Sequence, residues 1–173
     1  MLSERELGGL LDNFQRTAFR FEIRDRYNSE VGREAFRKFL AGEPDDYVWH
    51  RPWLDKLRRD HQQGKRWQRV RIVSVPLSDW MRYGTEVARL NVLAGEDIRY
   101  LRRQVAGGLG IAPYDAWLFD STRLVQLHFD KSDDTFCGAE TIADPAVVTR
   151  HLLWRELAWR HAQTRDEFVA ALR

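Results

Sequence analysis

A strand, a helix and a second strand follow one another in the middle of the chain, and this order limits the fold more than any other feature. An apolar, β-branched run from Val70 to Val75 predicts the first strand. Ser78 is a good N-cap for the helix that follows, Gly95 ends that helix, and Ile98 begins the second strand. Such a unit places two parallel strands in one sheet, joined by a right-handed crossover.

Three more strands are expected after this unit. The apolar segments 117–119 and 124–129 are separated by a turn at 120–122, and a second turn at 131–135 leads to the segment 136–142. Short segments joined by such turns predict a three-strand antiparallel meander.

The residues before the crossover are mostly helical in pattern. A first helix opens with a capping box formed by Ser3 and Glu6, a second covers 30–41, and a third ends at Gly64. Alternating apolar residues at 19–23 predict a short strand or an extended connector between the first two helices. We therefore expect an N-terminal helical extension.

The C-terminal third contains one glycine-rich segment and two helices. The glycines of 107–110 predict a flexible loop. Asp144 and Pro145 are an N-cap and a first-turn proline that open a long helix over 145–162. Thr164 begins a final short helix, with a capping box to Glu167.

Together these patterns predict an α/β (α+β) fold. We expect a mixed sheet that contains the crossover and the meander, with helices flanking it. The N-terminal helical part would cover residues 1–65 and the α/β part residues 66–173, and both would share one core.

The composition excludes several classes of protein. With 173 residues, 43% of them hydrophobic, the chain can bury a core without disulfides or metals. No apolar run approaches the roughly 20 residues of a membrane span, and the N-terminus is acidic and amphipathic, unlike a signal peptide. The single cysteine, Cys137, cannot form an internal disulfide. We expect a cytoplasmic globular protein.

Five charged residues around the crossover form the candidate ligand site. Parallel strands create a ligand crevice at their carboxyl ends, and the crossover helix begins there. A small anionic or polar ligand would contact Arg71, Asp79, Arg82, Glu86 and Arg99. Because several of these residues have helical contact spacing, ion pairs among them are the simpler interpretation.

The helix over 145–162 is apolar on all sides, which indicates burial on more than one side. We expect one face to cover the sheet and the N-terminal helices to cover another. The alternative is a partner protein, with Trp154 and Trp159 as its anchors.

Residues 56–71 are rich in Lys and Arg and contain Trp67. This composition suits contacts with nucleic-acid phosphates. A helix end followed by a strand would, however, spread these side chains over several faces. The acidic residues of the whole chain also nearly balance the basic ones, 26 against 28. We expect a solvated surface, with direct nucleic-acid contact as the alternative.

Several strings in the chain resemble an uncharacterised actinobacterial family, domain of unknown function 6879. The strings lie at 51–55, 71–79, 95–99, 117–120 and 138–140. The resemblance covers nearly the whole chain and implies no established activity. It does imply a genomic neighbourhood of helix-turn-helix regulators, and hence a possible partner of that kind.

The order of elements from residue 70 to 162 also distantly resembles half of a phospholipase D-like fold, including its degenerate ligand-sensing form. Active members carry His-x-Lys-x4-Asp, and the three aligned positions here are Asp115, Trp117 and Thr122. His128 is followed by Lys131 at the wrong spacing for this motif. The nucleophile and the phosphate-binding lysine of that class are therefore not matched.

The sequence thus favours a non-enzymatic cytoplasmic regulatory domain. It would bind a helix-turn-helix regulator or a small polar ligand, without a cofactor. We expect no metal, because His128 and Asp130 offer only two ligands on one strand face. The alternatives are a phosphodiesterase or nuclease with an unrecognised active site, and a nucleic-acid binder that uses 56–71.

Overall fold

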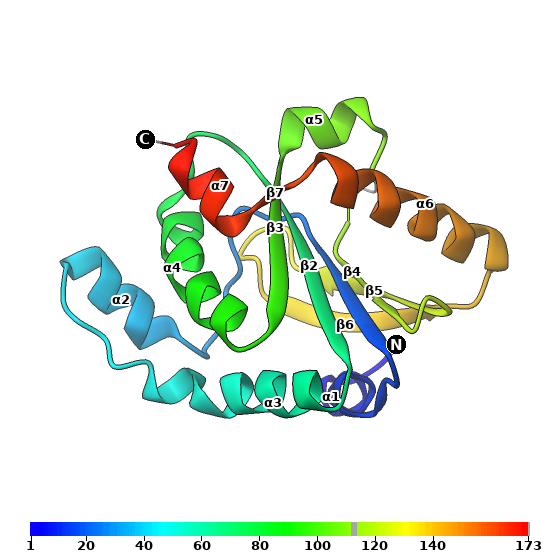
Figure 1. Cartoon of the computed structure of the whole chain (residues 1–173), viewed down its shortest axis with the longest axis horizontal. Coiled ribbons are helices and arrows are strands. Elements are labelled where there is room, and N and C mark those ends of the chain that lie inside the picture. Colours follow the sequence, from blue (N-terminus) through cyan, green and yellow to red (C-terminus); the bar gives the residue numbers. More distant parts are fainter. Residues whose placement is uncertain (112–113, 173) are drawn as a thin grey trace.

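Three parallel strands occupy the centre of the sheet, and antiparallel strands extend it on both sides (Figure 1). The computed structural model describes residues 1–111 and 114–172. These residues form a seven-stranded sheet in the order β6-β5-β4-β1-β2-β3-β7. The strands are β1 (Thr17–Glu22), β2 (Arg66–Val73), β3 (Glu96–Arg102), β4 (Ala116–Phe119), β5 (Arg123–Phe129), β6 (Phe136–Ile142) and β7 (Gln163–Thr164).

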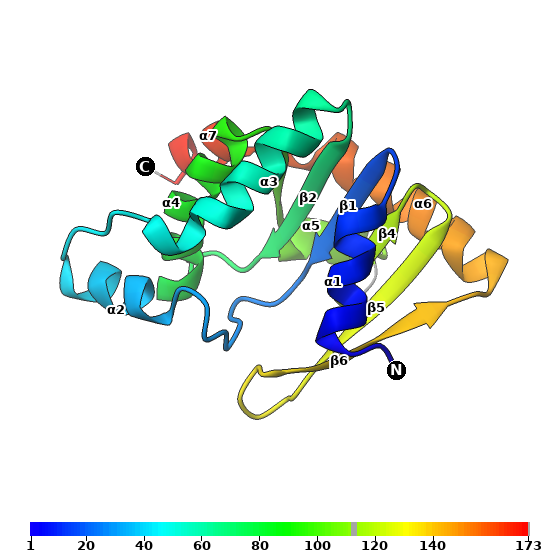
Figure 2. The same ribbon diagram turned by 90° about the horizontal axis from the view of Figure 1, so that it is seen from below.

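Helices cover both faces of this sheet. They are α1 (Glu4–Asn13), α2 (Arg33–Ala41), α3 (Arg51–Gln62), α4 (Asp79–Leu93), α5 (Arg103–Gly108), α6 (Pro145–His161) and α7 (Arg165–Ala170), with a 3-10 turn, η1 (Val48–His50), before α3. Figure 2 shows α1 and α3 in front of the strands and α6 behind them. The helix α4 lies on the face of α1 and α3, near the β3 edge, and α2 packs on its outer side.

The predicted fold class is confirmed, since β2, α4 and β3 form the crossover and β4, β5 and β6 form the meander. The two capping boxes that open α1 and α7 are also present. These elements were predictable because their signals are local: β-branched runs, turns and cap residues.

The prediction of a glycine loop at 107–110 is wrong in part. Gly107 and Gly108 belong to α5. Ala106 is buried in the apolar cluster under α6, and Leu109 packs against the same cluster. This packing outweighs the low helix propensity of glycine.

The strand β1 comes from the N-terminal part of the chain and lies between β4 and β2. The boundary predicted at residue 65 therefore separates β1 from β2, although the two strands are neighbours in one continuous sheet. No helix in the described ranges is long and apolar enough to cross a membrane.

Candidate functional site

The two faces of the central strands differ in chemistry. Phe19 and Phe21 of β1 point to the face covered by α6, where they join an apolar cluster with Val70 and Ile72 of β2. Side chains alternate along a strand, so the residues between them point to the opposite face. That face receives Arg20 and Glu22 from β1 and Arg69 and Arg71 from β2, and we call these four residues the charged floor.

The strand register places two arginines side by side and sets a glutamate beside a third arginine. Arg20 lies opposite Arg69, and Glu22 lies opposite Arg71. Adjacent like charges on neighbouring strands are destabilising unless carboxylates compensate them. Glu96, at the start of β3, is 2% exposed and supplies part of that compensation.

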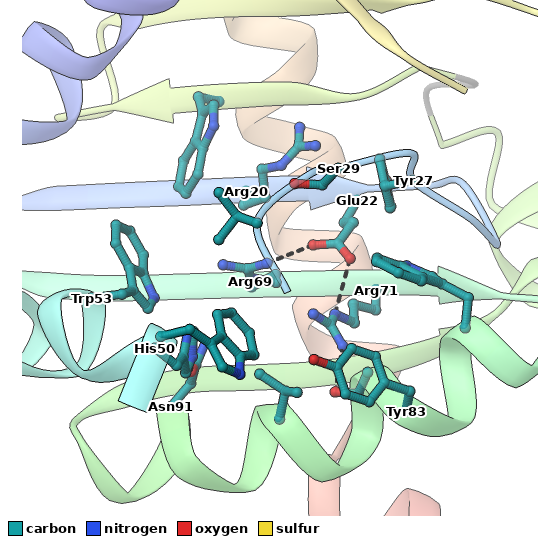
Figure 3. Close-up of a pocket in the computed structure, with 16 residues that line it drawn as sticks. Arg20, Glu22, Tyr27, Ser29, His50, Trp53, Arg69, Arg71, Tyr83 and Asn91 are labelled. Atoms are coloured by element: carbon teal, nitrogen blue, oxygen red, sulfur yellow. Dashed lines mark hydrogen bonds and ion pairs between the residues drawn. The ribbon is translucent and has the colours of Figure 1, made fainter. Parts of the chain in front are cut away.

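Glu22 pairs with two of the arginines of β2, Arg69 and Arg71. Its Oε2 accepts a hydrogen bond from Arg69 Nη1 at 2.6 Å, and its Oε1 lies 3.0 Å from Arg71 Nε (Figure 3). Arg69 Nε also donates to Glu96 at 2.8 Å. Arg71 Nη1 donates to the carbonyl oxygen of Gly84 on α4 at 2.8 Å, which fixes the floor to that helix.

The network continues to α3 through two uncharged side chains. Asn91 Nδ2 donates to Glu96 at 2.8 Å, so its Oδ1 faces His50 Nε2, 2.6 Å away. The ring of His50 must therefore carry its proton on Nε2. Burial lowers the pKa of His50 more than Asn91 raises it, and the ring is neutral near pH 7.

A second ion pair lies at the β4 side of the floor. Arg20 Nη2 donates to Asp115 Oδ1 at 2.7 Å, and the Tyr27 hydroxyl donates to the same oxygen at 2.6 Å. The Arg20 side chain is only 7% exposed, and its guanidinium lies 5.6 Å from the ring centre of Trp117. Its Nη1 has no hydrogen-bond partner among the described residues.

Glu22 and Arg69 of the charged floor are each held in one protonation state. Burial raises the pKa of Glu22, but Arg71 and Arg69 lower it more, to about 2. Burial likewise lowers the pKa of Arg69, and Glu96 and Glu22 more than reverse this. These groups are fixed charges near neutral pH, whereas a general acid or base needs a pKa near the working pH.

A cavity of about 440 Å³ opens above the charged floor, and we call it the sheet-face cavity. Its walls come from four separate segments: the β1–α2 connection with Tyr27, η1 and α3 with His50, α4 with Tyr83, and β4 (Figure 3). Four of the seven tryptophans line it, namely Trp49, Trp53, Trp80 and Trp117. The volume falls within the range of roughly 300–1,000 Å³ that small-molecule sites occupy.

The five predicted ligand residues do not form one site. Arg71 is part of the charged floor, whereas Asp79, Arg82 and Glu86 line a depression on the outer side of α4. There Arg82 pairs with Asp79 at 2.6 Å, and both side chains are more than half exposed. The predicted crevice at the strand ends is thus replaced by a cavity on the sheet face.

Arg99 lies on the opposite face of the sheet from Arg71. It pairs in register with Val70, so it shares the face covered by α6. Its guanidinium lies 4.1 Å from the ring centre of Trp159 and donates to the Trp159 carbonyl at 3.2 Å. Strand parity therefore separates the two arginines that the prediction placed together.

Trp154 and Trp159 are half-buried and pack against the apolar cluster between α6 and the sheet. Leu153 of the same helix is 61% exposed. The expectation that the N-terminal helices cover α6 is wrong, because β1 enters the centre of the sheet and α1 and α3 pack on the other face.

The basic stretch 56–71 is largely paired within the chain. Lys56 lies 3.1 Å from Asp12 and 3.3 Å from Asp60. Trp67 is 2% exposed and donates its Nε1 hydrogen to Asp60 at 2.9 Å. Arg69 and Arg71 belong to the charged floor, so this stretch does not form one exposed surface.

Sequence reasoning missed Arg20, Glu22, Glu96 and Asp115. The alternation of Phe19 and Phe21 with polar residues was visible, but polar positions of a strand normally face water. The available signal was that β2 alternates in a similar way, with Arg69 and Arg71 on either side of Val70. Two such strands side by side would bring their charges together.

The comparisons with known proteins identify a family but no activity. Residues 5–170 match the model of the family described as Domain of unknown function (DUF6879). No curated protein matches the chain.

Proposed function

The chain belongs to the DUF6879 family, and we propose that it is a non-enzymatic, cytoplasmic regulatory domain that binds a small polar ligand in the sheet-face cavity. The observation that carries this proposal is the buried charged floor under a cavity of ligand size. Charges are costly to bury, and a chain that only needed a core would place apolar residues there. The opposite face of the same strands is filled by apolar residues in this way.

The chemistry of the floor supports binding over catalysis. Glu22 stays ionised between two arginines, and His50 is neutral and hydrogen-bonded to Asn91. Fixed charges orient a ligand without exchanging protons with it.

The positions of Asp115 and Trp117 bear on the resemblance to the phospholipase D-like fold. Both are positions that align with the catalytic motif of phospholipase D-like enzymes. Trp117 lines the sheet-face cavity and Asp115 holds Arg20, and neither is a nucleophile of that class. We propose that this domain is related to the degenerate, ligand-sensing form of that fold and that its family is actinobacterial.

A capture experiment tests the proposed function. The tagged protein is purified from the cells that naturally make it, and mass spectrometry identifies every retained small molecule and protein. Val87→Trp adds bulk to a residue of α4 that lines the cavity. Leu93→Trp places the same side chain on a position of α4 that is 73% exposed, and it serves as the matched control.

We expect a small molecule near one per chain with the wild type and with Leu93→Trp, and its loss with Val87→Trp. Equal recovery from all three proteins would exclude the cavity as the binding site. Stoichiometric recovery of a DNA-binding protein in place of any small molecule would replace ligand binding by partner binding, with α6 and its exposed Leu153 as the first surface to mutate.

A further inference from the structure

We propose that the ligand of the sheet-face cavity is a flat-ring carboxylate, a compound with one planar ring system and a single carboxylate group. This inference deepens the proposed function and depends on it. It follows from the charge balance of the floor, from one unsatisfied donor, and from the composition of the walls.

The charge balance limits the charge of the ligand. Arg20, Arg69 and Arg71 line the cavity with Glu22 as their counterpart on the lining, so the surface that a ligand meets is positive. Glu96 and Asp115 lie directly behind it and pair with Arg69 and Arg20 at 2.8 and 2.7 Å. With these two carboxylates included, the three arginines are balanced. The network has no excess positive charge to neutralise a phosphate dianion, so the site suits at most one negative charge, placed against a donor that the network leaves unused.

Arg20 supplies the donor for that charge. Its Nη2 is used by Asp115, while Nη1 has no partner among the described residues although the side chain is 93% buried, the complement of its 7% exposure. A buried donor without a partner is costly, and an acceptor on a ligand would remove that cost. A hydrogen bond between a guanidinium and a carboxylate is also stronger than a neutral one.

The walls favour a planar ring. Trp49, Trp53 and Trp80 are each half-buried on the cavity lining, and the ring of Tyr83 lines it as well. Indole and phenol rings offer flat, apolar faces on which another ring can stack. The charged groups lie on the sheet, whereas Trp49, Trp53, Trp80 and Tyr83 come from η1, α3 and α4, so a ligand with a carboxylate at one end and a ring at the other matches both.

Calorimetric titration with three probes tests this class. Naphthoate has a planar ring and one carboxylate, naphthyl phosphate replaces the carboxylate by a dianion, and cyclohexanecarboxylate keeps the carboxylate but lacks a flat ring. Arg20→Lys retains the positive charge beside Asp115 but removes the second guanidinium nitrogen. Arg99→Lys makes the same change on the opposite face of the sheet, where Arg99 contacts Trp159.

We expect naphthoate to bind at least about ten-fold more tightly than either other probe, a difference of roughly 1.4 kcal/mol. Arg20→Lys should weaken naphthoate binding by about ten-fold, and Arg99→Lys should leave it unchanged. Tighter binding of naphthyl phosphate, equal binding of cyclohexanecarboxylate, or an equal loss in both lysine variants would overturn the inference.

The capture experiment separates this inference from the proposed function. If naphthoate does not bind but a small molecule of another class is lost with Val87→Trp, the ligand class is wrong and the cavity remains a ligand site. If neither naphthoate nor any captured molecule occupies the cavity, both proposals fail.

Discussion

The two faces of the central strands use opposite means to fill the same sheet. On one face Phe19 and Phe21 pack against α6, with Trp159 at 5.6 Å from the Phe19 ring. On the other face Arg20 and Glu22, one position away in the same strand, join a network of ion pairs. Apolar packing needs only complementary shape, whereas buried charges need a partner for each group.

This difference explains why the cavity lies where it does. Apolar side chains interdigitate and leave little space, as on the α6 face. The charged floor is fixed by hydrogen bonds to α4 and β3, so the side chains above it do not have to fill the volume. The proposed ligand site uses the charged part of one face, while apolar clusters on both faces supply stability.

The largest expected effect comes from the apolar face. Phe21→Ala removes a fully buried ring between the sheet and α6. We expect the free energy of unfolding to fall by about 4 kcal/mol, because the ring's burial is lost and a cavity remains. Urea denaturation measures this change, and a loss below about 1 kcal/mol would show that the α6 face is not the main stabilising core.

The second-largest loss of stability is expected from Glu22→Gln, on the charged face. The substitution keeps the shape but leaves Arg69 and Arg71 without their shared negative charge. Breaking such a buried pair should lower the free energy of unfolding by about 3 kcal/mol at pH 7. Glu86→Gln, at a half-exposed position, is the matched control. Its only ion pair within the described residues, with Arg165, is 3.9 Å long, and the substitution should change stability by less than about 0.5 kcal/mol.

The same variant has a defined pH dependence. The pKa of Glu22 is lowered from 4.5 to about 2 in the folded chain, so its contribution is complete above pH 4.5 and is lost as the pH falls toward 2. The difference between wild type and Glu22→Gln should therefore shrink over this interval. Urea denaturation between pH 7 and pH 3 measures it, and a difference that stays constant would show that Glu22 is not ionised in the native network.

The smallest effect is expected from the outer side of α4. Arg82→Ala removes an ion pair with Asp79 whose two side chains are 59% and 58% exposed. Stability should change by less than about 0.5 kcal/mol. Naphthoate binding should also be unchanged, because Arg82 does not line the sheet-face cavity. A ten-fold weaker binding, about 1.4 kcal/mol, would return the ligand site to the outer side of α4.

The helices and strands and their order along the chain follow from short-range signals in the sequence. Ser3 and Glu6, Ser78, and Thr164 with Glu167 start helices through hydrogen bonds within a few residues, and the structure contains each of them. The crossover and the meander were predictable for the same reason, since β-branched runs and short turns specify strands locally.

Which polar residues are buried together depends on contacts between segments that are distant in the chain. Arg20 meets Asp115, and His50 meets Asn91, across large separations in the chain. The place of β1 between β4 and β2 creates the first contact and the packing of η1 against α4 creates the second, and no local pattern specifies either. Because a strand shows alternation but not which neighbour covers each face, the sequence gives the charges of the site and the packing of distant segments makes the cavity.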